Sequence, residues 1–406
     1  LSVNTTTSSS DGDTLTLTLT AGGGRDGDLD QIKIMRYLAM WPSRTYIAML
    51  STAVSDCATG GDAQPLVPIP TSNATRVNTW TGDGTQPNLI AFDLDMNDAK
   101  LRLVFDEPVN ATAFVVDQIT IQSESTTASS SYTLSSESVL SPRAHSTVLH
   151  IEISKGDLDA MNEIAELTMT AESTFISITS DATADVFGWW EYNNTRAPLA
   201  LKAIDSTHAR AVRTFTTDTT SPNLHRCWID MDAGKLKLEF DEVVDVGALD
   251  VTGIRLQYAK YLPTSGDEAS EFLKLSNSSS YTTTTSDSTT LFVWLGDDDL
   301  NDLKARASTF VDLASSWLVL STRTITDGFG NAVAELRNGR ALQATNFTAD
   351  TTRPRIISFT LYAAGTMTLR FDETIDWLSA DPTQITMTTG TDSTSHFPLT
   401  SATTGA

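Results

Sequence analysis

The sequence predicts an all-β chain of tandem antiparallel β-sandwiches, each with one short crossing helix. Two observations predict this class: a strand-like motif returns at a domain-sized spacing, and apolar residues alternate with polar ones in many short segments. The motif reads LRLVFDEPV at 101–109, LKLEFDEVV at 236–244 and MTLRFDETI at 367–375. Its phenylalanines are 135 and 131 residues apart, so the motif belongs to a repeated scaffold.

Three linker segments set the boundaries of the repeats. They are TWTGDGTQP from Thr79, TFTTDTTSP from Thr214 and NFTADTTRP from Asn346, and each combines an Asp, a small polar run and a Pro that stiffens the chain. We therefore expect four segments, which are the C-terminal half of a repeat (1–78), two complete repeats (79–213 and 214–345) and the N-terminal half of a repeat (346–406).

Each linker is followed by strands with one apolar face. In the first complete repeat, Phe92, Leu94 and Met96 alternate with polar residues, and a short turn leads to the LRLVF strand. Further strands are expected at 119–123, 148–154 and 174–179 and at the corresponding places of the other copies, with a last candidate at 197–204.

One helical signal occurs in each copy, as GDLDQIK, GDLDAMN and DDLNDLK. We expect Asp28, Asp157 and Asp299 to act as helix N-caps. Six or seven short strands and one short helix in a repeat of this length favour a sandwich of immunoglobulin-like type.

The motifs DTTSP, GKLKLEFDE and ITDGFGN resemble the tandem immunoglobulin-like repeats of microbial surface and adhesin proteins. They are also similar to repeat arrays in extracellular fibrils and flagellar hairs of protists and algae. The resemblance covers nearly the whole chain, and it implies an extracellular or cell-surface location and an architectural role.

Composition narrows the possible partners. A net charge of −24 argues against binding to nucleic acid or to an anionic membrane, because both would repel an acidic surface. There is no apolar run near 18 residues, so we expect no membrane insertion. Two cysteines do not make a disulfide scaffold. We expect Cys227 to be a buried thiol, because Phe92 and Phe359 occupy its position in the other copies, and the pairing of loop residue Cys57 stays open.

The adjacent carboxylates of the FDE motif have three interpretations. Catalysis is disfavoured, because neighbouring strand residues point to opposite faces, and no other catalytic pattern occurs, so we expect no enzyme. A structural calcium site is one alternative, since nearby carboxylates could supply oxygen ligands. The plainer alternative is a strand end whose carboxylates bind turn amides or basic neighbours. The calcium candidates are Asp93, Asp95, Asp106, Glu107, Asp218, Asp241 and Glu242.

Other surface features point to glycans and partners. Six Asn-x-Ser/Thr sequons could carry N-glycans, and the Ser/Thr clusters could carry O-glycans. The sequons are Asn4, Asn73, Asn110, Asn193, Asn277 and Asn346. Trp189 and Trp190 occur in one repeat only, as FGWWEY, and are candidates for an interface anchor or a sugar-stacking platform.

The two half repeats are complementary. Either the chain is a window on a continuous repeat array, or the C-terminal half of one copy is completed by the N-terminal half of the next, head to tail. We therefore expect a structural subunit or segment of an extracellular filament, with copies of itself as partners and no cofactor beyond possible calcium and glycans. The alternative function is an adhesin that binds carbohydrate or a partner surface.

Overall fold

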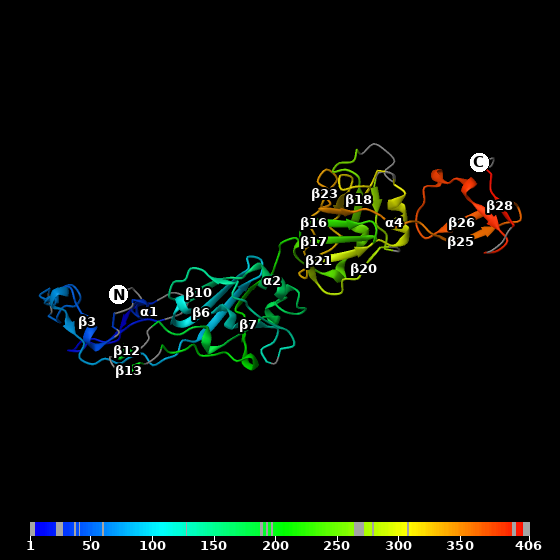
Figure 1. Ribbon diagram of the computed structural model, residues 1–406. Coiled ribbons are helices and arrows are strands. Elements are labelled where there is room, and N and C mark those ends of the chain that lie inside the picture. Colours follow the sequence, from blue (N-terminus) through cyan, green and yellow to red (C-terminus); the bar gives the residue numbers. More distant parts are fainter. Residues whose placement is uncertain are drawn as a thin grey trace. The chain divides into compact units, whose positions relative to one another are not determined.

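The computed structural model describes most of the chain. The described residues are 5–21, 27–35, 38–39, 41–58, 61–126, 128–186, 190–191, 194–195, 198–263, 272–277, 280–306, 308–391 and 395–400. They form two compact units: Leu1–Thr220 with Gly328–Asn331, and Ser221–Asp327 with Ala332–Ala406. The predicted all-β class is confirmed, since both units consist mainly of strands and their helices are short (Figure 1).

The first complete repeat contains two sheets. The five-stranded sheet has the order β15-β5-β6-β10-β9, and the four-stranded sheet has the order β14-β11-β7-β8. The strands are β5 (Leu89–Asp95), β6 (Lys100–Val109), β7 (Ile119–Gln122), β8 (Ser131–Thr133), β9 (Val139–Leu140), β10 (Ser146–Glu152), β11 (Phe175–Ile178), β14 (Arg210–Ala211) and β15 (Thr214–Thr216). Ala200, Lys202 and Ile204 make only isolated bridges, to Ala184, Asn88 and Ile178, so the last strand candidate is only partly realised.

The second complete repeat has the same strand order. Its sheets are β24-β16-β17-β21-β20 and β23-β22-β18-β19, which match the first repeat position by position. The strands are β16 (Leu224–Asp230), β17 (Lys235–Val244), β18 (Ile254–Gln257), β19 (Phe272–Lys274), β20 (Tyr281–Thr282), β21 (Ser288–Trp294), β22 (Trp317–Leu320), β23 (Leu342–Gln343) and β24 (Asn346–Thr348).

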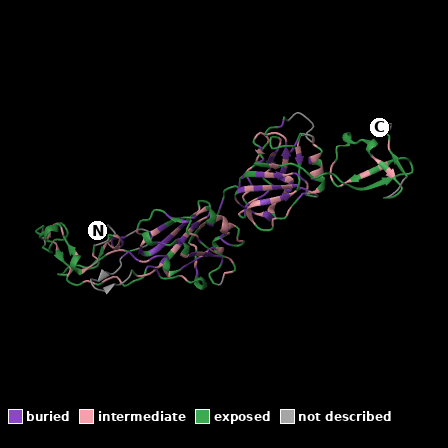
Figure 2. Cartoon of the chain, viewed as in Figure 1, coloured by how far each residue is buried: buried purple, intermediate pink, exposed green. Residues whose placement is uncertain are grey.

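The two sheets of each repeat share one apolar core. In the first repeat this core joins Phe92 and Phe105 of the five-stranded sheet to Ile121 and Ile176 of the four-stranded sheet. Burial of such side chains contributes roughly 1.5–3 kcal/mol each. Figure 2 shows the buried residues concentrated in the strands of the complete repeats. The expected alternation therefore positions the core.

One pairing differs from the expected antiparallel arrangement. The strand β15 pairs in parallel with β5, and β24 pairs in parallel with β16. We placed domain boundaries at Thr214 and Asn346, and these residues begin the edge strands that close the preceding sheets. A parallel neighbour is possible because the whole repeat forms the connection between the two strands.

In the residues that the structure describes, the half repeats contain fewer strand pairs than the complete repeats. Their strands are β1 (Thr6–Thr7), β2 (Leu17–Thr18), β3 (Tyr46–Ile47), β4 (Thr75–Arg76), β25 (Ile356–Leu361), β26 (Met367–Phe371), β27 (Thr386–Thr388) and β28 (His396–Pro398). They pair as β1-β2, β3-β4, β25-β26 and β27-β28. Of the expected strand at 14–20, only Leu17–Thr18 is in strand conformation, and these residues pair with β1.

The short hairpin β12 (Trp190–Glu191) and β13 (Asn194–Thr195) lies in the first complete repeat.

Within the described residues, three α-helices lie where the helical signals predict them, but the expected N-caps are wrong. They are α1 (Asp28–Ile34), α2 (Lys155–Asn162) and α4 (Asp297–Lys304), and their N-caps are Gly27, Ser154 and Gly296. The aspartates lie inside the first turn and face the protein interior.

These aspartates attach the helices to the Ser-rich loops. Asp157 accepts hydrogen bonds from the Tyr132 hydroxyl at 2.8 Å, the Ser135 backbone N–H and the Ser138 hydroxyl. Asp299 accepts equivalent bonds from Ser276 and Ser280. Burial alone would raise the pKa of Asp157, but these bonds outweigh it and lower the pKa.

The Asp157→Asn substitution should lower the free energy of unfolding by about 2 to 4 kcal/mol, because it removes charge-assisted bonds from a buried acceptor. The loss should shrink as the pH falls below about 4, because the unfolded chain takes up a proton at this carboxyl group before the folded chain does. Asp159→Asn, on the same helix, should cost under about 1 kcal/mol, because Asp159 only pairs with Lys155 at the surface. Chemical denaturation measures both, and equal losses would contradict the role of Asp157.

Candidate functional site

The FDE aspartate fixes the start of each repeat. Asp106, Asp241 and Asp372 accept a hydrogen bond from the backbone N–H of the residue after the linker proline, at 2.8, 2.7 and 2.6 Å. The backbone N–H of each aspartate donates in return to the carbonyl of that same residue. The three copies therefore join the linker to the second strand of the following sheet in the same way.

The FDE glutamate has a different partner, a lysine of the preceding helix. Lys33 lies 2.5 Å from Glu107 and 2.7 Å from the linker residue Asp83, all within the first unit. Lys304 lies 2.9 Å from Glu373 and 2.7 Å from the linker residue Asp350, all within the second unit. These two sets, called the lysine junctions below, connect a helix, a linker and the next repeat.

The lysine junctions are mostly buried, and this shapes their titration. Burial alone would lower the pKa of Lys33 and Lys304, but in each case the two carboxylates outweigh it and raise the pKa. Burial raises the pKa of Glu107 to about 7, and it raises the pKa of nearby Asp185 to about 6. The first junction thus holds more carboxylates than one ammonium neutralises.

A second set of contacts fixes the linker where it leaves a complete repeat. The Asn97 side chain accepts hydrogen bonds from the backbone N–H of Thr219 at 3.1 Å and from its hydroxyl at 2.7 Å. In the second unit, Asp232 accepts from the backbone N–H of Thr351 at 2.9 Å and of Thr352 at 3.0 Å. Asn97 and Asp232 occupy the same place in the turn between the first two strands.

The calcium candidates have diverse surroundings. Asp93 pairs with Arg102 and Arg213, Asp95 accepts from the Asp98 backbone N–H, and Asp106, Asp241 and Glu107 have the partners given above. Asp218 accepts from the Thr220 backbone N–H at 2.8 Å. These bonds match the plainer alternative of strand ends bound to amides and basic neighbours, and calcium stays a prediction.

The helix of the first complete repeat carries Asn162 at the position of Lys33 and Lys304.

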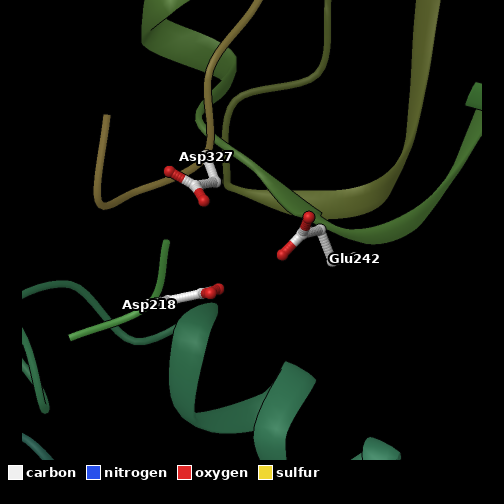
Figure 3. Close-up of side chains that lie close together, drawn as sticks. All are labelled: Asp218, Glu242 and Asp327. Atoms are coloured by element: carbon white, nitrogen blue, oxygen red, sulfur yellow. The ribbon is translucent and has the colours of Figure 1, made fainter. Parts of the chain in front are cut away.

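In the second unit, Glu242 and Asp327 have carboxylate oxygens within 4.8 Å of each other (Figure 3). Asp327 lies in the ITDGFGN turn and was not among the calcium candidates. Figure 3 also draws Asp218, which belongs to the first unit.

The remaining candidates are surface features or lie outside the described residues. Asn73, Asn277 and Asn346 are exposed, and Asn110 is half-buried and caps a short 3₁₀ turn. Asn4, Asn193 and Trp189 lie outside the described residues, and Trp190 is described only by its backbone in β12. Both cysteines are free, with Cys57 exposed and Cys227 buried as expected. Burial raises the pKa of Cys227 to about 12.

Sequence reasoning missed the linker contacts of Lys33, Lys304, Asn97 and Asp232. A signal for the lysines was present, since both end the same helical motif, but the asparagine of the middle copy hides it. The side chains of Asn97 and Asp232 gave no such signal, because turn residues of this type are ordinary in hairpins.

The fold and these junctions define a mostly β protein of tandem repeats. No family model matches the sequence, and a search of curated proteins finds no match. Among solved structures, the S-layer protein rSbsC(31-844) aligns with a TM-score of 0.18 and 8% identity over 71% of this chain and 46% of that chain. A marsupial T cell receptor aligns with a TM-score of 0.14 and 11% identity over 68% of this chain and 78% of that one. Both scores are too low to carry an argument.

No helix in the described part of the chain has the length and apolar character needed to cross a bilayer.

The raised pKa values predict an inverse pH dependence in the first unit. Since Glu107 and Asp185 bind protons more tightly when folded, the free energy of unfolding should fall as the pH rises from about 4 to 7. The variant carrying both Glu107→Gln and Asp185→Asn should lose most of this slope. Urea denaturation between pH 5 and pH 8 measures it, and a variant as steep as the original chain would contradict the assignment.

The Lys304→Met substitution should loosen β26 from α4, because it leaves Glu373 and Asp350 partly buried without their cation. We expect amide exchange in residues 367–375 to become about 10- to 100-fold faster, which corresponds to about 1.4 to 2.7 kcal/mol of local opening. The exposed Lys260→Met is the control. Unchanged exchange in Lys304→Met would show that the ion pairs contribute nothing to this attachment.

Proposed function

We propose that the chain is a load-bearing structural segment of an extracellular filament, built from tandem immunoglobulin-like repeats. The observation that carries this proposal is the parallel pairing of the first and last strands in each complete repeat. Its supporting features are the linker contacts at both ends of a repeat.

The strand geometry favours resistance to tension. The chain enters the first repeat at the start of β5 and leaves it at the end of β15. Because the two strands are parallel neighbours, a pull on both ends acts along the strands in opposite directions. All the hydrogen bonds between the two strands must then break together, whereas an antiparallel pair loaded at one end would open one bond at a time.

Additional bonds reinforce the same strand pair. The Arg213 backbone N–H donates to Phe92 at 2.8 Å and the Met96 backbone N–H donates to Thr216 at 2.9 Å. In the second repeat, the Thr345 backbone N–H donates to Cys227 at 2.7 Å and Met231 donates to Thr348 at 2.9 Å. Both complete repeats therefore carry the same bonds beyond the paired strand residues.

Hydrogen bonds and ion pairs attach the linkers to the neighbouring repeats. Asn97 and Asp232 bind the outgoing linkers, and the lysine junctions bind linkers and following strands to the preceding helix. Fixed linkers transmit tension between repeats with little slack. The two β-sheets around one core, in one strand order, support the immunoglobulin-like assignment of each repeat.

The surface composition agrees with an extracellular role. A net charge of −24 keeps a crowded array soluble through mutual repulsion, and exposed sequons such as Asn73 and Asn277 are accessible for N-glycans. The adhesin alternative depends on Trp189 and Trp190, and no contact of the described residues favours it.

Stretching single chains between their ends should produce two main force peaks, one for each complete repeat. Each peak should release about 40 nm of chain, the extended length of the residues enclosed between the first and last strands. Thr345→Pro removes the donor to Cys227 and should lower one of the two peaks. Thr345→Ala keeps the N–H and should leave both peaks unchanged. Unfolding without resolvable peaks would rule out a load-bearing pair.

A further inference from the structure

The outer face of the five-stranded sheet in the second complete repeat carries aromatic residues. Core residues alternate along its strands with Trp228 of β16 and with Phe292 and Trp294 of β21. These three rings are half-buried and lie on the face away from the core. Strands β16, β17, β21 and β20 lie side by side in this sheet, all within the second unit (Figure 1).

Lysine side chains lie between these rings. The ammonium of Lys237 is 4.2 Å from the centre of the Trp228 ring, and that of Lys235 is 3.9 Å from the centre of the Phe292 ring. An ammonium at such a distance is attracted to the negative face of an aromatic ring. Lys237 therefore helps to hold the Trp228 indole in one orientation.

A sequon asparagine lies next to Trp228 on the same face. Asn346 begins β24 and is the register partner of Trp228 in the parallel pair of β24 and β16. Paired residues of neighbouring strands point to the same face of the sheet, and the strands are about 4.8 Å apart. Asn346 is exposed, whereas the next residue, Phe347, packs against the core. Trp228 thus has Lys237 on one side and the sequon asparagine on the other.

Of the two complete repeats, the second alone has this combination of ring and sequon. In the first complete repeat, Asp93 and Thr214 hold the corresponding positions and face each other in the same way. There Asp93 pairs with two arginines. In the third copy of the motif, Thr360 takes the place of Trp228. The shared scaffold therefore does not require an aromatic ring at this position.

We propose that an N-glycan on Asn346 stacks its first sugar on the Trp228 ring and thereby fastens β24 to β16. This inference rests on the proposed load-bearing function, because these two strands are the parallel pair that carries tension in the second repeat. The sugar is bonded to one strand and packs on a side chain of the other. It adds a contact that must break before the strands slide past each other.

The chemistry of both partners suits this contact. The first sugar of an N-glycan is a pyranose whose C–H groups form an apolar patch on one face. Their hydrogens are attracted to the negative face of an indole, and stacking removes apolar area of both rings from water. Atoms in contact lie about 3.5–4.0 Å apart, which a sugar on the neighbouring strand reaches without rearrangement of the sheet. The glycan is the occupant because its asparagine is the neighbour of the ring.

Occupancy of the site is the first requirement. Chains secreted by eukaryotic cells should carry a glycan at Asn346, which mass spectrometry of the peptide measures. Thr348→Ala keeps the asparagine but removes the sequon, so the sugar signals that this variant loses belong to the glycan on Asn346. An unmodified Asn346 would overturn the proposal.

Proton NMR of the glycosylated chain tests the stacking. The indole ring current should shift the protons of the first sugar upfield. Trp228→Thr should abolish this shift, and the variant should fold because Thr360 holds the same position in another copy. Trp294→Thr is the matched control, since Trp294 lies on the same face but two strands farther from β24, and the shift should persist. A shift that survives Trp228→Thr would overturn the proposal.

Unfolding at constant force tests what the stacked sugar does. One of the two unfolding steps should be about 3- to 10-fold slower in the glycosylated chain than in Asn346→Gln, because the contact is lost on the way to the transition state. When Trp228→Thr is present, removal of the sequon should no longer change this rate. The step of the first repeat is the internal control. Asn277→Gln removes an exposed sequon outside the strand pair and should leave both rates unchanged.

The outcomes separate the stacked sugar from the load-bearing function. Two resolved steps with equal rates in the glycosylated chain and in Asn346→Gln would leave the load-bearing function standing and would overturn the fastening by the sugar. A glycan effect that persists in Trp228→Thr would also overturn it, because the sugar would then act without the ring. Unfolding without resolvable steps would remove the load-bearing function, and the NMR shift would still decide whether the sugar stacks on Trp228.

Discussion

The parallel contact between the first and last strands is the interaction on which each complete repeat depends. It places the beginning of β5 and the end of β15 at opposite ends of one strand pair. The backbone therefore enters and leaves the repeat at opposite ends of these strands. Asn97 and the lysine junctions bind the linkers next to these entry and exit points. The architecture is therefore organised around where the backbone enters and leaves.

The copies differ at one polar position of the helix. The cores share their strand order and apolar positions, and the FDE aspartate makes the same bond in three copies. The helix position that holds Lys33 and Lys304 holds Asn162 in the middle copy. A tandem array can thus keep one scaffold and change the chemistry of its joints by substituting a single helix residue.

Sequence patterns predicted the apolar framework well. Alternation at Phe92, Leu94 and Met96 identified a buried strand face, because a period of two leaves little freedom in register. The parallel edge strands escaped prediction, since three residues such as Thr214–Thr216 carry too little pattern to show which partner they choose. The role of Asp157 was misjudged for a related reason: a buried acceptor and a helix cap use the same residue type. Contacts between Lys33 and Glu107 depend on three-dimensional proximity across 74 residues, which a local motif does not reveal.

The edge strand β15 also bears on how the chain folds as it is made. Its residues belong to the linker that opens the following repeat, so the sheet of the first complete repeat lacks its closing strand until that linker has been synthesised. Synthesis from the N-terminus therefore makes β5 wait longer for its second neighbour than β6 and β10, the other interior strands of its sheet. The sheet of a repeat is complete only when synthesis of the next repeat begins, so the repeats fold in order from the N-terminus.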